Sequence, residues 1–362
     1  MKKIIRDSNF ELLRIFAIML VIVSHFNVHS YWMIGGVSDF SLNLFMKFLF
    51  SVGCIANIIF IILTGYFMVK SRIKIQKIIS LILEMYFYSI IILLFAKFIF
   101  NMEVSWTDLR SSLLPFPFGN WFVVAYIVLY LLIPFINKAV ENFGRKQLLE
   151  LICTCLLVFS IMPILTSWAF FSNFVVFPVA YLIGAYIKLY VGEINKKRVT
   201  KYLVVTVALI ACSIALIYGT ALILQKPELV KHSTYFLVKN SSPLVIAAAT
   251  FIFLIFRDAK VKPSKIINRL ASSVLGIYLI HENVFMRRLL WGGDFISIDI
   301  YNTNPLMFIL LATAKSLLVF AGCLAIDQLR IVLFGKTEKL LANAIYRRIV
   351  AILTKIKFYD IL

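Results

Sequence analysis

Residues 10–29 read FELLRIFAIMLVIVSHFNVH, and residues 79–100 read ISLILEMYFYSIIILLFAKFIF. Each stretch is long enough to cross the apolar core of a bilayer as a helix, which takes about 20 residues. Neither alternates apolar and polar residues as a membrane β-strand does. These two stretches therefore predict a chain built of membrane-spanning α-helices.

The composition of the whole chain points the same way. Of its 362 residues, 62% are hydrophobic and 15% are charged, whereas a soluble domain is about one-half apolar and one-quarter charged. A water-soluble fold would have to expose much of this apolar surface. We predict an all-α, polytopic transmembrane helix bundle of ten spans, at residues 10–29, 48–68, 79–100, 121–137, 148–167, 172–190, 202–224, 242–257, 270–286 and 305–329.

The formal net charge is +20. In a soluble protein this charge would suggest nucleic acid as a partner, but in a membrane protein Lys and Arg gather in the cytosolic segments. With ten spans and a cytosolic N-terminus, a large majority of the Lys and Arg residues fall on the cytosolic side. We therefore predict that both termini are cytosolic, that the protein is a multi-pass protein of the cell (plasma) membrane, and that it binds no nucleic acid.

The chain divides into a transmembrane domain at residues 1–336 and a cytosolic amphipathic tail at residues 337–362. In a tail helix, Arg347 and Arg348 would face lipid headgroups while Ile345 would dip inward. A solvated tail is the alternative. The five cysteines lie in apolar stretches without the spacing of a metal site, so we expect neither a disulfide framework nor a metal.

Polar side chains share one face of the first predicted span. The spacing from Arg14 to His25 is about three helical turns at roughly 100° per residue, so both lie on one face. Glu11 lies one turn before Arg14, near enough to pair with it. Ionisable groups inside a membrane are costly and are candidates for function. We expect this face to line a protein-filled or wet interior, although a packing pair and a buried hydrogen-bonding histidine would also explain it.

The segment RDSNFELLRIFA at residues 6–17, followed by His25, resembles the opening of the acyltransferase-3 family of membrane acyltransferases. That family carries an acidic residue three positions before an Arg, and then ten residues and a His. Four more motifs resemble the family in the same order: FIILTGYF at 60–67, Trp121-Phe122 with Tyr126, Tyr130 and Pro134, YLIGAY at 181–186, and LGIYLIH at 275–281. Glu11 and Thr64 stand where the family more often has Asp and Ser.

The resemblance implies transfer of an acyl group, usually acetyl, from cytosolic acyl-CoA to a hydroxyl of a cell-surface polysaccharide or lipid-linked glycan. We expect acetyl-CoA as the donor, with succinyl or another short acyl group left open. A transporter or flippase of a lipid-linked glycan is the alternative, although transporters commonly show internal repeats and we find none. A membrane sensor or scaffold is a third reading.

On this reading the predicted catalytic residues are His25, Arg14 and Glu11. His25 acts as general base on the acceptor hydroxyl or carries the acyl group as an acyl-imidazole, since the free pKa of imidazole is about 6.5. Glu11 holds Arg14, and Arg14 positions the donor.

The remaining predicted contacts are to donor and acceptor. Arg72 and Lys74 are predicted to bind the CoA phosphates, with Tyr66 and Arg14 in the same donor site; the concentration of positive charge in cytosolic segments also explains Arg72 and Lys74. Trp121 and His281 are predicted to contact the acceptor, and His281 could instead complete the site opposite His25. A plain interfacial position explains His281 equally well, and aromatic residues are ordinary at the interface where Trp121 lies.

Overall fold

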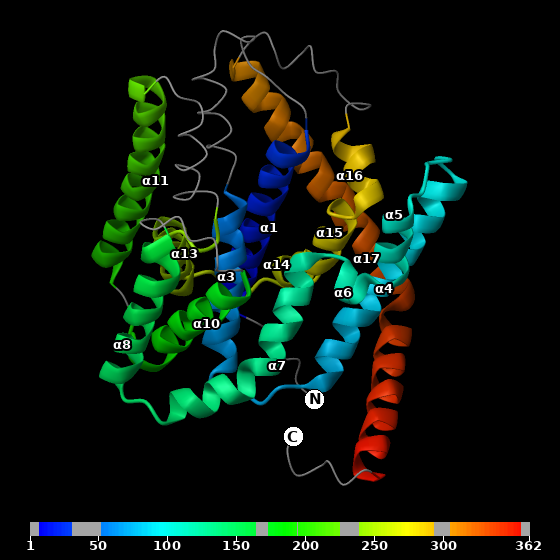
Figure 1. Ribbon diagram of the computed structural model, residues 1–362, viewed down its shortest axis with the longest axis horizontal. Helices are drawn as coiled ribbons and strands as arrows, with labels where there is room; N and C mark the ends of the chain where they lie inside the picture. The colour runs from blue at the N-terminus through cyan, green and yellow to red at the C-terminus, as the bar shows by residue number, and fades with distance from the viewer. Residues whose placement is uncertain are drawn as a thin grey trace.

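The computed structural model describes residues 7–30, 52–163, 173–193, 195–224, 239–292 and 305–355. All regular elements within those residues are helices (Figure 1). In chain order they are α1 (Ser8–His29), α3 (Gly53–Met68), α4 (Ile75–Phe98), α5 (Trp106–Leu113), α6 (Pro115–Phe118), α7 (Trp121–Glu141), α8 (Arg145–Leu156), the π-helix η1 (Leu157–Ile161), α10 (Asn173–Tyr190), α11 (Lys196–Leu224), α13 (Pro243–Arg257), α14 (Lys265–Ala271), α15 (Val274–His281), α16 (Val284–Trp291) and α17 (Pro305–Lys355).

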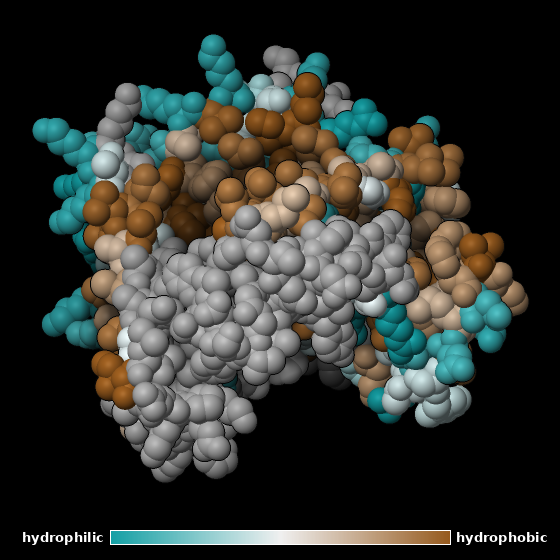
Figure 2. Space-filling view, turned by 90° about the horizontal axis from the view of Figure 1, so that it is seen from above, coloured by the Kyte–Doolittle hydropathy of each residue, from teal (hydrophilic) through white to brown (hydrophobic). Residues whose placement is uncertain are grey.

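The helices have the length and surface expected for a membrane. Four of the described helices, α1, α4, α7 and α17, are long and apolar enough to cross one, and shorter apolar helices accompany them. Large apolar side chains remain exposed on their outer faces, among them Phe98, Phe135 and Leu318. Seen from above, apolar surface is broad and hydrophilic side chains gather toward its margin (Figure 2). The predicted all-α architecture is confirmed, while the ten spans and the cytosolic termini remain predictions.

The predicted span at 270–286 is not one helix. It is divided among α14, α15 and α16, and the prediction of a continuous helix there is wrong. Local capping explains the break: the Asn283 side chain accepts a hydrogen bond from the Phe285 backbone N–H and so starts α16 afresh. The chain therefore turns at Glu282, directly after His281 ends α15.

Helix α1 lies at the centre of the bundle. It packs against α3, α13, α14, α15 and α17, and Leu13, Ile18, Ile22 and Phe26 along its length are buried. Neighbouring helices therefore enclose the face that carries Arg14 and His25.

Two glycines let α3 and α10 approach closely: Gly65 of the motif at residues 60–67 and Gly184 of the motif at residues 181–186. A Cβ on Gly65 would overlap the backbone of Tyr181, and a Cβ on Gly184 would overlap the backbone carbonyl of Ile62. Small residues allow this kind of backbone contact between membrane helices. The two glycines thus set the separation of α3 and α10.

Helix α17 has 51 residues, which at about 1.5 Å per residue is more than twice the thickness of a bilayer core. The part of the predicted tail that is described, residues 337–355, continues α17 without a break. The domain boundary at residue 336 stays a prediction, and residues 356–362 lie outside the described residues. In Figure 1 α1 starts in the lower half of the bundle and α17 ends below it; we call this lower part the basal end.

A buried charge network joins α17 to α4. Arg330 donates to Asp327 at 2.8 Å, to Glu84 at 2.9 Å and to Glu338 at 2.6 Å. The Tyr88 hydroxyl donates to the same Asp327 oxygen at 2.6 Å. Because its partners surround it, the buried guanidinium is compensated, and it fixes α17 against α4 near the basal end.

Candidate active site

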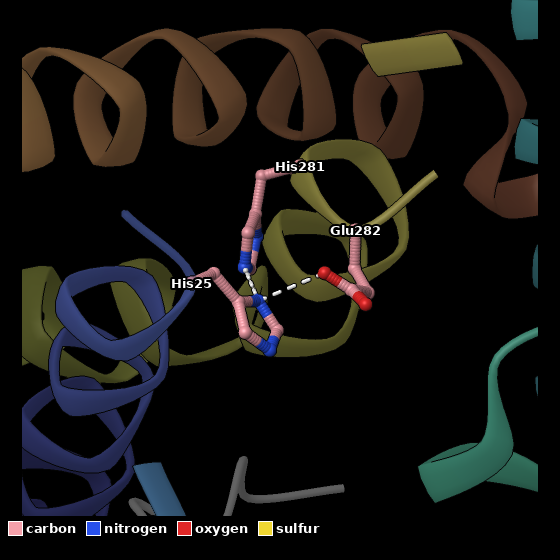
Figure 3. A group of neighbouring side chains, drawn as sticks. All are labelled: His25, His281 and Glu282. Atoms are coloured by element: carbon pink, nitrogen blue, oxygen red, sulfur yellow. Dashed lines mark hydrogen bonds and ion pairs between the residues drawn. The ribbon is translucent and has the colours of Figure 1, made fainter. Parts of the chain in front are cut away.

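His25 of α1 meets His281 and Glu282 at the end of α15 (Figure 3). Its Nδ1 lies 2.9 Å from His281 Nε2 and 3.0 Å from Glu282 Oε2. His281 is fully buried, whereas 18% of the His25 side chain is exposed. The break after α15 makes this arrangement possible, because it turns Glu282 back toward the ring that His281 already faces.

The hydrogen bonds of His281 define the protonation of His25. His281 Nδ1 lies 2.6 Å from the carbonyl oxygen of Ile277, which can only accept, so this nitrogen carries the proton. A neutral His281 then presents a lone pair at Nε2, and the Glu282 carboxylate presents another. His25 Nδ1 therefore carries the proton that faces both acceptors. Its Nε2 is left with the lone pair that a general base needs.

Two further side chains hold the Glu282 carboxylate. His29 Nε2 lies 3.3 Å from Oε2, and Arg287 Nη1 lies 3.4 Å from Oε1. His29 comes one turn after His25 on α1, and Arg287 comes from α16. Contacts on both oxygens fix the carboxylate against His25.

An ion pair anchors the helix that follows Glu282. Arg288 of α16 donates to both carboxylate oxygens of Asp108 in α5, at 3.0 and 2.8 Å. Burial by itself would raise the pKa of Asp108, but the hydrogen bonds from Arg288 and Ser105 outweigh it and hold that pKa below its ordinary value. The carboxylate stays charged near neutral pH, which keeps α16 in place.

A cavity of about 710 Å³ runs along α1 beneath this cluster. Glu11 and Arg14 line it toward the basal end, and Val21, Phe122 and Tyr278 line it toward the histidines. His25 is one helical turn beyond Val21, and the Tyr278 ring centre lies 6.3 Å from the His25 ring centre. The Tyr278 side chain thus stands between the cavity and the histidine pair.

Polar groups also line the middle of the cavity. They include Asn57, Thr64, Tyr126 and Tyr130, and the Thr64 hydroxyl lies 3.4 Å from that of Tyr126. Sequence reasoning gave none of these four a role, although Thr64, Tyr126 and Tyr130 stood in the quoted motifs. The spacing of Tyr126 and Tyr130, four residues apart and so on one face of α7, was the available signal.

The structure places Glu11 and Arg14 as a pair. Arg14 Nη1 lies 2.5 Å from Glu11 Oε1, and Glu11 is buried while 30% of the Arg14 side chain is exposed to the cavity side. Arg14 also lies 6.0 Å from the centre of the Phe67 ring. The guanidinium is therefore held at the cavity wall by a buried carboxylate.

The other residues predicted for the donor site lie elsewhere. Arg72 and Lys74 are exposed in the turn between α3 and α4, and neither belongs to the described lining of the cavity; Lys77, in the first turn of α4, does. Tyr66 packs against Phe253 and also lies outside that lining. Helix α4 begins at Ile75, and Lys77 in its first turn is exposed but borders the cavity.

The two predicted acceptor contacts also differ in position. Trp121 begins α7, is 42% exposed and packs near Phe177. His281 is fully buried beside His25. Acceptor binding by either residue stays a prediction.

The same three residues, His25, His281 and Glu282, could hold a metal ion, since their ligand atoms lie within 4.8 Å of one another. Zinc bonds of about 2.0–2.1 Å in a tetrahedral site would keep those atoms roughly 3.3 Å apart. The observed 2.9 Å between the two ring nitrogens is an ordinary hydrogen-bond distance. The geometry therefore favours a shared proton.

A family model described as an acyltransferase domain, acyltransferase-3, matches residues 7–327. The chain belongs to the acyltransferase-3 family. Searches of curated proteins and of solved structures find no match. As a member of this family with apolar helices long enough to cross a bilayer, the protein is a membrane acyltransferase, and the enzyme reading prevails over a transporter or a scaffold.

Proposed function

We propose that this acyltransferase-3 protein moves a short acyl group, acetyl in the first instance, from acyl-CoA to a hydroxyl of a cell-surface polysaccharide or lipid-linked glycan. The proposal includes a multi-pass position in the cell membrane with cytosolic termini. The observation that carries it is the cluster of His25, His281 and Glu282 beside one end of a cavity that holds Arg14 toward its other end.

In the proposed reaction His25 Nε2 takes the proton of the acceptor hydroxyl. The hydroxyl oxygen attacks the thioester carbonyl carbon, the carbon–sulfur bond breaks, and the sulfur leaves with the proton returned by His25. The products are an ester and free CoA. Glu282 lies 3.0 Å from His25 Nδ1 and stabilises the imidazolium that forms in between.

A relay through His25 uses the same lone pair. Here Nε2 attacks the thioester carbonyl carbon, the carbon–sulfur bond breaks and CoA leaves as the thiolate. The acceptor hydroxyl then attacks the acyl carbon, the carbon–nitrogen bond breaks, and the hydroxyl proton neutralises the CoA thiolate. Rapid quenching of the protein with radiolabelled acetyl-CoA in the absence of acceptor distinguishes the two routes: a relay labels the wild type and leaves His25→Ala unlabelled, and direct transfer labels neither.

Arg14 has a positioning role in this proposal. The buried Glu11 fixes its guanidinium at the cavity wall, and a planar guanidinium suits the oxygen atoms of a carbonyl or a phosphate. The donor would then lie along α1 with its thioester toward Tyr278.

The test is the composition of the surface glycan. In a strain lacking the gene, mass spectrometry of the surface polysaccharide should show the loss of one acyl mass, restored by the wild-type gene but not by His25→Ala. Immunoblots of membrane fractions must show equal amounts of both proteins. Acylation close to normal with His25→Ala, or an unchanged glycan in the deletion strain, would refute the proposal.

A further inference from the structure

The basal end of the cavity is built partly from residues beyond the family match. That match ends at residue 327, yet Lys339, Ala342 and Asn343 of α17 line the cavity. They face it together with Lys77 of α4 and Arg14 of α1. Three cationic side chains from three different helices therefore border one cavity.

The acidic residues of the same cavity already have cationic partners. Glu11 is paired with Arg14, and Glu84 is paired with Arg330 at 2.9 Å. Arg330 also contacts Asp327 and Glu338, so it offsets the charge of Glu84 only in part. The paired carboxylates therefore oppose an anionic ligand less than free carboxylates would.

The turn that carries Lys339 is fixed in position. Its neighbour Glu338 accepts a hydrogen bond from Arg330 at 2.6 Å, and Arg330 is in turn held by Asp327 and Glu84. This network sets the rotation of α17 just before the cavity-lining residues. Lys339 is consequently placed by the fold, although its own side chain is exposed.

The cavity is long enough to hold the pantetheine arm of an acyl-CoA. Its cationic lining places the anionic part of such a donor at the basal end. Along α1 the lining runs from Glu11 to Val21, which is about 15 Å of helix at 1.5 Å per residue and comparable with an extended pantetheine arm. An acyl-CoA laid along it would bring its thioester toward Tyr278 and its phosphates toward Lys77 and Lys339. Ammonium groups bind phosphate as point charges.

We propose that the extension of α17 beyond the family match forms a wall of the donor site, and that Lys339 together with Lys77 binds the phosphate groups of acyl-CoA. This inference rests on the proposed function. It assigns to Lys77 and Lys339 the role that the sequence suggested for Arg72 and Lys74.

The experiment measures CoA binding by the full-length protein in lipid nanodiscs, using isothermal titration calorimetry. Loss of one charge-assisted contact should weaken binding about tenfold in Lys339→Ala and more in Lys77→Ala with Lys339→Ala. Lys336→Ala is the matched control, because Lys336 is an exposed lysine on the same helix that does not belong to the described lining. It should bind CoA like the wild type.

A second measurement separates phosphate binding from a structural effect. Turnover of acetyl-pantetheine, which lacks the nucleotide phosphates, should be equal in the wild type and Lys339→Ala, while the KM for acetyl-CoA rises about tenfold with kcat unchanged. Equal loss with both donors would overturn the inference.

The remaining outcomes are distinct from one another. If the wild type binds no CoA, the proposed function itself fails; if it binds CoA and Lys339→Ala binds equally well, only this inference fails. Anionic lipid headgroups share the chemistry of the CoA phosphates. A Lys339→Ala defect present in nanodiscs with anionic lipid but absent in purely zwitterionic ones would assign Lys339 to the membrane and overturn the inference.

Discussion

Nε2 of His25 is the atom on which the proposed chemistry depends, because Nδ1 is already engaged with His281 and Glu282. His281 Nε2 accepts a hydrogen bond from the Nδ1–H of His25 and so orients that proton. Glu282 supplies a negative charge that stabilises the His25 imidazolium. Of the two partners, the carboxylate is the one that stabilises charge during the reaction.

Replacing Glu282 by Gln tests that role at the scale of one residue. Gln keeps the shape and one accepting oxygen but removes the charge, so kcat should fall about a hundredfold or more with little change in the KM for the donor. Arg287→Gln is the control, since Arg287 touches the other carboxylate oxygen at 3.4 Å and is partly exposed. Equal rates for Glu282→Gln and the wild type in membrane assays would show that the carboxylate has no part in the chemistry.

The metal alternative is tested at the same residues. Because the 2.9 Å separation of the ring nitrogens fits a shared proton, dialysis of the purified protein against EDTA should leave the acyl-transfer rate unchanged. Loss of activity on chelation, with recovery on adding Zn²⁺, would instead place a metal between His25, His281 and Glu282.

Helical periodicity explains which single residues could be predicted. The spacing of Glu11, Arg14 and His25 along one helix defines their shared face, and the structure places this face inside the bundle. A site shared by His25 and His281 could be offered only as one alternative for His281, because the two positions are 256 residues apart and no periodic signal reports such a contact. The carboxylate of Glu282 was overlooked for the same reason.

At the scale of helices, the close approach of α3 and α10 depends on two glycines, Gly65 and Gly184, at which no Cβ fits. Gly65→Ala would push its new methyl group into the backbone of Tyr181, so we expect a loss of about 1–3 kcal/mol of stability. Gly322→Ala in α17 is the matched control, since no described atom lies within 4 Å of its added Cβ. Thermal unfolding in detergent measures both, and a Gly65→Ala protein that melts like the wild type would contradict close packing of these helices.

The helix boundaries show why the sequence indicates apolar helices more readily than the site. Hydropathy finds an apolar stretch at 270–286 but does not register the cap at Asn283 that divides it. That division turns Glu282 toward His25. Likewise, only the true start of α4 at Ile75 shows that Lys77, rather than Lys74, faces the cavity.

At the scale of the whole molecule, the distribution of Lys and Arg residues predicts how the protein is oriented in the membrane. The start of α1 and the end of α17 lie at the basal end (Figure 1), and the predicted cytosolic segments hold most of the Lys and Arg residues. The basal end should therefore be cytosolic, on the side of the proposed acyl-CoA donor.

Reporter fusions after residue 362 test this orientation. A C-terminal green fluorescent protein should fluoresce and a C-terminal alkaline phosphatase should be inactive, because both reporters would lie in the cytosol. Active phosphatase would reverse the orientation and place Lys77 and Lys339 on the wrong side for a cytosolic donor.

The most direct test of the account is acyl transfer by purified protein in nanodiscs, comparing His25→Ala with His29→Ala. His29 contacts the same Glu282 oxygen at 3.3 Å but lies one turn farther along α1, which makes it the matched histidine. We predict that His25→Ala binds CoA with unchanged affinity and loses transfer by about a hundredfold or more, while His29→Ala retains most of it. Transfer by His25→Ala at the wild-type rate would contradict the central claim that this imidazole performs the chemistry.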